Sequence, residues 1–127
     1  MAFATNHDRY LAAWETAFRL GDTTDLERFP APSYQGFFGH AGVTMVEPVD
    51  REESIQGVRL FSRALRGASA RAEGRTVRMR SETEAVVTFE RIIEREGAPV
   101  AVYAVMQSWR KAGEAWLVVR ETAEHIK

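Results

Sequence analysis

The chain has 127 residues, of which 45% are hydrophobic, and its 17 basic and 18 acidic residues leave a formal net charge of -1. This length suits one soluble domain, residues 1–127, and is short for two. Cysteine is absent, which excludes disulfides, thiolate catalysis and cysteine-bound metal centres. No apolar run reaches the roughly 18 residues of a membrane span, and the N-terminus lacks signal-peptide features. We therefore expect a cytoplasmic protein that does not enter a membrane.

The N-terminal segment predicts a long helix followed by a short one. Apolar residues recur at three- and four-residue intervals over residues 6–20, which is the period of an amphipathic helix. Thr5 and Asp8 have the spacing of a capping box at its start. A second helix is expected over residues 24–29, and it ends before Pro30 because proline cannot continue it.

Residues 33–49 are rich in glycine and aromatic residues, and they predict two short strands, 34–38 and 43–47. Asp50 followed by Glu53 is an N-terminal capping signature. It predicts a third helix that runs to about residue 65. A strand over residues 71–80 is expected to follow.

The C-terminal third predicts an antiparallel meander. Valine, isoleucine and aromatic residues fill the segments 85–94, 100–110 and 115–124, as is typical of half-buried strands. Glu96-Gly97 and Ala112-Gly113 separate them, and glycine accepts the positive φ of a tight turn. Helices followed by a run of strands predict an α+β fold.

Three motifs carry a resemblance to the nuclear transport factor 2-like superfamily, which includes the SnoaL-like polyketide cyclases and the ketosteroid isomerases. Leu20-Gly-Asp22 resembles its first inter-helix junction, Asp50-Arg-Glu-Glu-Ser-Ile55 its common helix start, and the segment from Ser108 to Trp116 its closing hairpin. The resemblance implies a cone-shaped, curved antiparallel sheet wrapped around the N-terminal helices, with a pocket open at one end, as in cystatin-like folds.

The sequence departs from the isomerases where their catalytic groups would lie. Ser33–Phe38, which matches the strand of the isomerase base, contains no acid, and Gln107 stands where they have a protonated Asp. Their helical Tyr matches Trp14, while Tyr10 lies one turn earlier. Steroid isomerisation needs a base and two strong donors, so we reject that activity.

Strand register decides which side chains face the pocket. The resemblance puts Gln107 on the pocket face, so Tyr103 and Trp109 share that face. If the turn at Glu96-Gly97 has three residues, Phe89 and Arg91 face the pocket as well. A two-residue turn would swap the faces of residues 85–94.

The predicted ligand-binding residues are aromatic side chains together with a few polar ones. They are Trp14, Phe18, Phe89, Arg91, Tyr103, Gln107 and Trp109. Each has an alternative interpretation. The aromatic residues suit a plain core, Gln107 suits a buried amide, and Arg91 could form an ion pair with an acid such as Glu121.

His40 is the weak candidate for a catalytic residue, because it lies in a glycine-rich segment. We expect His7 and His125 to be exposed, and no metal-ligand spacing or cofactor motif is present. Seven arginines and one acid lie between Arg59 and Arg80. Lysine is nearly absent and no aromatic residues interleave this cluster, so it favours a solvated face over a nucleic-acid site.

The leading functional hypothesis is a small-molecule-binding domain with an apolar pocket for a hydrophobic or acidic ligand, held at Arg91. One alternative is an isomerase, cyclase or hydrolase acting on a polyketide-like or aromatic substrate. Another is a dimeric interaction module whose cone is filled by side chains. We also expect a homodimer, because Val102, Ala104 and Met106 with Val86 and Ile92 form an apolar strip on the outer face of the sheet.

Overall fold

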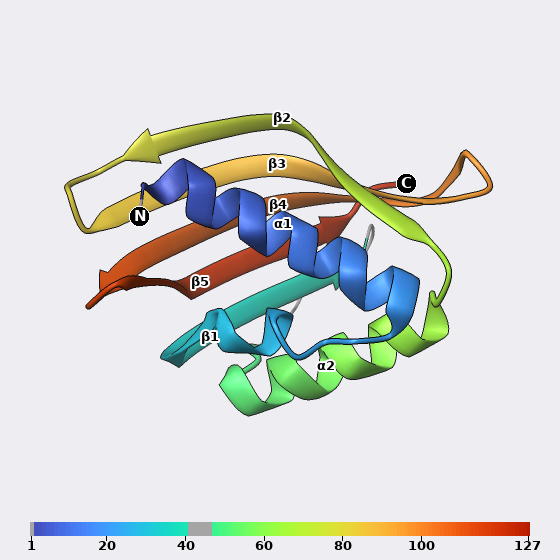
Figure 1. Cartoon of the computed structure of the whole chain (residues 1–127), viewed down its shortest axis with the longest axis horizontal. Helices are drawn as coiled ribbons and strands as arrows, with labels where there is room; N and C mark the ends of the chain where they lie inside the picture. Colours follow the sequence, from blue (N-terminus) through green and yellow to red (C-terminus); the bar gives the residue numbers. More distant parts are fainter. Residues whose placement is uncertain (1, 41–46) are drawn as a thin grey trace.

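The computed structural model describes residues 2–40, without the His40 side chain, and residues 47–127. Within these residues, two helices, a single 3-10 turn and five strands follow one another (Figure 1). They are α1 (Phe3–Leu20), η1 (Leu26–Arg28), β1 (Pro30–His40), α2 (Arg51–Ala64), β2 (Ser69–Met79), β3 (Glu84–Arg95), β4 (Ala98–Ala112) and β5 (Ala115–His125).

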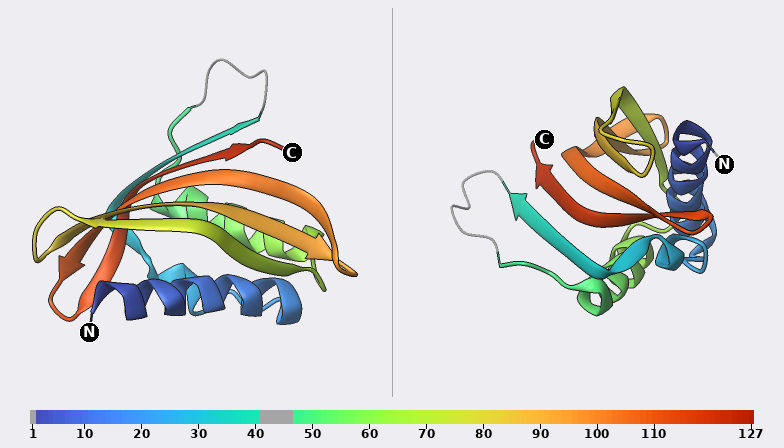
Figure 2. Two further views of the ribbon diagram at one scale, coloured as in Figure 1. Left: turned by 90° about the horizontal axis from the view of Figure 1, so that it is seen from above. Right: turned by 90° about the vertical axis from the view of Figure 1, so that its left-hand side faces the viewer.

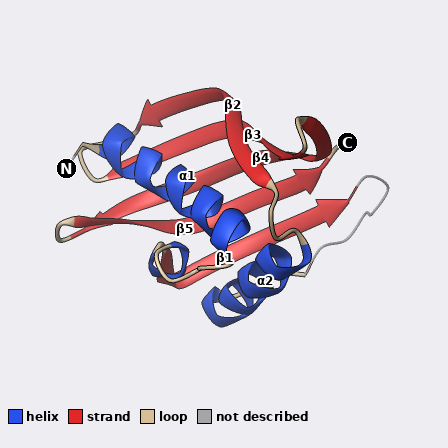
Figure 3. Cartoon of the chain, turned by 45° about the vertical axis from the view of Figure 1, so that its right-hand side comes forward, coloured by secondary structure: helices blue, strands red, loops and turns tan. Residues whose placement is uncertain are grey.

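The five strands form one curved, open sheet in the order β1-β5-β4-β3-β2. Figure 2 shows the sheet curving over α1, and Figure 3 shows α2 on the same side beside β1. The expectation of an antiparallel sheet needs one correction, because β1 pairs with β5 in parallel. Helix α2 carries the chain from β1 to the opposite edge, and three successive hairpins then bring it back, so the sheet is mixed.

Helix α1 begins one turn earlier than predicted, and its N-cap is Ala2, which makes no side-chain capping bond. The predicted capping box of Thr5 and Asp8 is therefore wrong. The early start brings Phe3 into the core, where its ring lies 5.6 Å from that of Trp109 and 5.1 Å from that of Trp116. Burial of this ring stabilises a turn that has no polar cap.

Helix α2 has the capping box that the sequence predicts. The Glu53 backbone N–H donates to the Asp50 carboxylate at 2.8 Å, and the Asp50 N–H donates to the Glu53 carboxylate at 3.2 Å. The predicted helix over residues 24–29 is only a 3-10 turn. Strand β1 is longer than the predicted 34–38, and the predicted 43–47 strand lies outside the described residues except for Glu47, which is in no strand.

The inward faces of β3 and β4 are those predicted, although the connecting turn differs. Phe89 pairs with Val105 and Arg91 with Tyr103. The turn has two residues, which alone would have reversed the faces, but the pairing shifts by one residue at Val100. This β-bulge restores the inward register along the rest of the hairpin.

A second bulge settles the ambiguous register of β5. Ser108 pairs with Arg120 and Trp109 with Val118, so Val119 is the extra residue. The strand therefore turns both Val118 and Glu121 inward, and both are buried. Without the bulge, an odd spacing of three residues would have put them on opposite faces.

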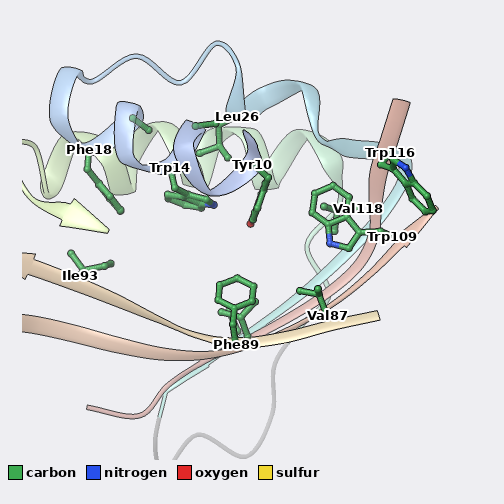
Figure 4. Close-up of a cluster of buried hydrophobic side chains, with 14 of the residues drawn as sticks. Tyr10, Trp14, Phe18, Leu26, Val87, Phe89, Ile93, Trp109, Trp116 and Val118 are labelled. Carbon is green, nitrogen blue, oxygen red and sulfur yellow. The ribbon is translucent and has the colours of Figure 1, made fainter. Parts of the chain in front are cut away.

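The core lies between α1 and the concave face of the sheet. Trp14 and Phe18 are 7% and 0% exposed, as predicted for a helix packed inside a curved sheet. Figure 4 shows both side chains, with Tyr10, directed from α1 toward Phe89 and Ile93 on β3. Arg91 lies on β3 between these last two residues.

Candidate functional site

A cavity of about 350 Å³ opens between α2, the end of β1 and the inner faces of β3, β4 and β5. Its wall is largely apolar, and its polar side chains come from both α2 and the strands. The apolar side chains are Trp14, Phe38, Val49, Val58, Phe61 and Ala123, and the polar ones are Glu53, Ser54, Arg91, Tyr103 and Glu121. An apolar hollow with a few convergent polar groups is the usual form of a small-molecule site.

Arg91 projects inward from the middle of β3 and is only 6% exposed. One of its terminal nitrogens, Nη2, donates to the Tyr10 hydroxyl at 2.9 Å, and its guanidinium carbon lies 4.4 Å from the centre of the Trp14 ring. Its remaining N–H groups have no protein acceptor among the described residues. A guanidinium carries five such donors, so most of the hydrogen-bonding capacity of Arg91 is unused.

Glu121 lies on β5, which β4 separates from the strand of Arg91, and it is 8% exposed. Its Oε1 accepts a hydrogen bond from the Tyr34 hydroxyl at 2.8 Å. Its Oε2 accepts from the Gln107 amide at 2.6 Å and from the Tyr10 hydroxyl at 3.4 Å. Glu121 and Arg91 form no direct ion pair within residues 2–40 and 47–127. The Tyr10 hydroxyl connects them instead of the direct pair that the sequence suggested.

Gln107 is 1% exposed, and its neighbours fix which way its amide points. Its Oε1 accepts from the indole N–H of Trp109 at 3.0 Å, and its Nε2 donates to the Tyr10 hydroxyl at 2.8 Å. An indole only donates and a carboxylate only accepts, so the opposite orientation would oppose both Trp109 and Glu121. Gln107 therefore behaves as the fully bonded buried amide of the alternative interpretation.

His7 extends this arrangement from the other end and is completely buried, so the expectation that it is exposed is wrong. Its Nε2 lies 3.2 Å from Gln107 Oε1, and its Nδ1 lies 3.3 Å from Nη1 of Arg75. When Nε2 carries the proton, it donates to Gln107 Oε1, and Nδ1 accepts from Arg75. We call the six connected side chains the Tyr10 network: His7, Tyr10, Tyr34, Arg91, Gln107 and Glu121.

Burial perturbs the titration of this network. It raises the pKa of Tyr10 to about 12, and the Glu121 charge acts in the same direction. Burial also raises the pKa of Tyr34 and of Tyr103. These hydroxyls are therefore protonated donors at neutral pH. Burial lowers the pKa of His7 from 6.5 to about 4, although its hydrogen bond to Gln107 acts in the opposite direction.

The His7 shift predicts a loss of stability in mild acid. Below pH 6.5 the unfolded chain takes up a proton at His7 that the folded chain refuses until about pH 4. The free energy of unfolding contributed by this group is thus intact above pH 6.5, and about 3 kcal/mol is lost as the pH falls to 4. His7→Gln keeps a donor for Gln107 but cannot titrate. In urea denaturation across this range, the variant should lose about that much less stability than the wild type, and parallel curves would contradict the assignment.

The structure distributes the predicted site residues between the cavity and the core. Trp14, Arg91 and Tyr103 line the cavity. The other four, Phe18, Phe89, Gln107 and Trp109, are buried in the core beside it and do not line its wall. His40 is the last residue of β1, and its side chain lies outside the described part of the chain. His125 is half-buried, and its ring stacks on Tyr103 at 4.9 Å.

Sequence reasoning gave no site role to His7, Tyr10 or Tyr34. It treated Glu121 as a partner for Arg91 and as one of the acids whose surroundings would test the enzyme alternative. The spacing of His7, Tyr10 and Trp14 on one face of α1 is a signal that could have found the first two. Tyr10, rather than Trp14, meets Gln107. Tyr34 and Glu121 could not be placed, because one depends on a parallel pairing and the other on a bulge.

Two further features of the described residues bear on the class of site. Residues 2–40 and 47–127 contain no group of three or more His, Cys, Asp or Glu side chains arranged to hold a metal ion. Over the same ranges, no helix has both the length and the apolar character needed to span a bilayer.

The fold is the feature that this chain shares with known proteins. No protein-family profile and no curated protein matches the sequence, but solved structures match the fold over nearly the whole chain. The chain has the cystatin-like fold of the nuclear transport factor 2-like proteins, with an α+β architecture and a curved, open sheet.

Three solved structures illustrate the likeness. A cystatin-like protein of unknown function from Nostoc punctiforme has a TM-score of 0.76 at 15% identity, covering 97% of this chain and 90% of its own. An NTF2-like protein from Novosphingobium aromaticivorans has a TM-score of 0.73 at 16% identity. The match covers 98% of this chain and 82% of that protein. A putative calcium/calmodulin-dependent protein kinase II association domain from Xanthomonas campestris has a TM-score of 0.71 at 17% identity. The match covers 98% of this chain and 85% of that domain.

Proposed function

We propose that the chain is a single SnoaL-like domain that binds a small molecule in the cavity between α2 and the concave face of the sheet. The observation that carries the proposal is Arg91, a buried guanidinium with unused donors at the polar end of an apolar hollow. A buried charge costs several kcal/mol unless hydrogen bonds compensate it. A ligand that accepts from Arg91 supplies the missing bonds.

The cavity dimensions and walls restrict this ligand. A volume of about 350 Å³ is at the small end of the range for ligand pockets. Trp14, Phe61 and Val58 provide an apolar wall for the body of the ligand, while Arg91 suits an oxygen acceptor such as a carboxylate or carbonyl. We therefore propose a compact, partly aromatic molecule with one polar end.

The titratable side chains of the Tyr10 network are poorly suited to catalysis. Both oxygens of Glu121 already accept hydrogen bonds, and the pKa of Tyr10 is raised to about 12, which makes it a poor acid or base near pH 7. His7, buried beneath Gln107, does not line the cavity. The arrangement suits recognition better than proton transfer.

Three phenyl compounds of nearly equal shape test the binding proposal: 3-phenylpropanoate, 3-phenylpropanamide and 4-phenylbutan-2-one. At least one should bind in isothermal titration, and Arg91→Met should weaken that binding about tenfold or more, because a hydrogen bond to a charged group contributes about 1.5–3 kcal/mol. Arg95→Met, an exposed change on the same strand, is the matched control and should leave affinity unchanged. Absence of binding by all three, or equal losses in both variants, would refute the proposal.

We also propose a homodimer formed through the outer face of the sheet. The apolar strip is narrower than expected, because Ile92 and Val102 are buried within the chain, and Val102 forms backbone hydrogen bonds with the C-terminal residues. Met106 remains 49% exposed at the centre of the face. Ala104 and Val86 are partly exposed beside it.

Charged rows flank Met106 on this outer face. The pairing places Ala104 between Glu90 and Glu124, and it places Ser108 between Val86 and Arg120. Carboxylates therefore lie on one side of Met106, while Arg120, with Arg78 next to Val86, lies on the other. A twofold axis across the strands at Met106 sets each acidic row against the arginine row of the partner. The likeness to a kinase association domain supports self-association.

Charge reversal tests this dimer by sedimentation equilibrium. The wild type should sediment as a dimer at micromolar concentration, and the double change Glu90→Arg with Glu124→Arg should give monomers, because like charges then face each other. Mixing that variant with the Arg78→Glu, Arg120→Glu variant should restore a dimer. A monomeric wild type, or a dimer that is indifferent to either reversal, would contradict the proposed interface.

A further inference from the structure

We infer that the ligand carries a neutral polar head with a hydrogen-bond donor beside its acceptor, as a primary carboxamide does, and not a free carboxylate. The inference rests on the proposed binding function and specifies which chemistry the cavity selects. It follows from the position of Glu121 next to Arg91, which the sequence did not establish.

Arg91 and Glu121 present opposite hydrogen-bonding characters to the same cavity. Both side chains line its wall, and both are more than nine-tenths buried. Each contacts the same Tyr10 hydroxyl oxygen, Arg91 at 2.9 Å and Glu121 at 3.4 Å. The polar end therefore offers a cationic donor and an anionic acceptor to one bound group.

The charges around the cavity disfavour an anion. A carboxylate bound to Arg91 would lie close to the Glu121 carboxylate in a largely apolar cavity, where like charges repel strongly. Glu53 adds a second acid to the wall. The N-terminus of α2, which could otherwise attract an anion, is capped by Asp50 and carries Glu52 and Glu53 in its first turn. A neutral head avoids this repulsion.

Glu121 has room for one more donor. Its Oε1 accepts only from Tyr34 among the described residues, and a carboxylate oxygen has two lone pairs. On the core side, Glu121 already binds one carboxamide, because the amide nitrogen of Gln107 donates to its Oε2 at 2.6 Å. A ligand carboxamide completes the arrangement from the cavity side. Its carbonyl accepts from Arg91, and its N–H donates to Glu121.

The same three phenyl compounds test this inference in the wild-type protein, so no variant needs to fold. The amide, the ketone and the carboxylate share one phenylethyl body and differ only in the head group. Isothermal titration at pH 7 should give an affinity for 3-phenylpropanamide at least tenfold above that for 4-phenylbutan-2-one, which lacks the donor. The same margin is expected over 3-phenylpropanoate, which carries the charge.

The possible results distinguish failure of the neutral head group from failure of the proposed binding function. Equal or tighter binding of the carboxylate, with loss of affinity in Arg91→Met, overturns the neutral head and leaves the binding function standing. No binding by any compound overturns both. Glu121→Gln is the second measurement, with its folding checked by urea denaturation. It should bring the carboxylate to within a few-fold of the amide, and an unchanged preference for the amide would also overturn the inference.

Discussion

Replacing Trp14 with alanine is expected to lower the free energy of unfolding by about 3–5 kcal/mol, the usual cost of deleting a large aromatic side chain from a core. The ring is 7% exposed, and its centre lies 5.3 Å from that of Phe18 and 6.1 Å from that of Phe61. It also covers the Arg91 guanidinium. The substitution therefore leaves a void and removes the aromatic face over a buried charge.

Urea denaturation measures this change, and Leu20→Ala provides the matched control on the same helix. Leu20 is 59% exposed at the end of α1, so its truncation should alter stability by less than about 1 kcal/mol. A Trp14→Ala loss as small as that of the control would show that the indole does not pack between α1 and the sheet.

Gln107→Leu is the second change with a large expected effect. Leucine keeps most of the volume but removes the amide that joins Trp109, Tyr10 and Glu121. The indole N–H then loses its partner in a buried site, and Glu121 Oε2 loses the shorter of its two hydrogen bonds. Each such group costs about 1–3 kcal/mol and a charged one more, so stability should fall by about 3 kcal/mol or more.

The control for this substitution is Gln35→Leu on β1, where the glutamine is exposed and its removal should be nearly neutral. Comparable urea midpoints for the two variants would mean that the Tyr10 network contributes little to stability. A large difference would establish that Gln107 is held by the bonds described above and is not a passive core residue.

Regular features of the fold could be predicted from the sequence because each rests on a local pattern. The apolar period of α1 placed Trp14 and Phe18 in the core, and the Asp50 and Glu53 pair located the start of α2. The β-branched and aromatic segments located the meander. Strand parity then placed Arg91 and Tyr103 on the inner face.

Most of the buried polar network could not be predicted, because it depends on features without a local signal. The inward position of Glu121 requires the bulge at Val119, and that of Tyr34 requires β1 to pair with β5 in parallel. The inward position of Arg91 was predicted from an assumed three-residue turn, whereas the structure reaches the same register through two turn residues and a bulge at Val100. His7 looked exposed because residues 2–5 were not expected to extend the helix.

The most direct test of the proposed ligand site is a crystal structure of the protein with whichever of the three phenyl compounds binds most tightly. We expect electron density for the phenyl ring against Trp14 and Phe61, with the head-group oxygen within hydrogen-bond distance of Arg91. A cavity closed by protein side chains, or a compound bound only on the outer face of the sheet near Met106, would contradict it.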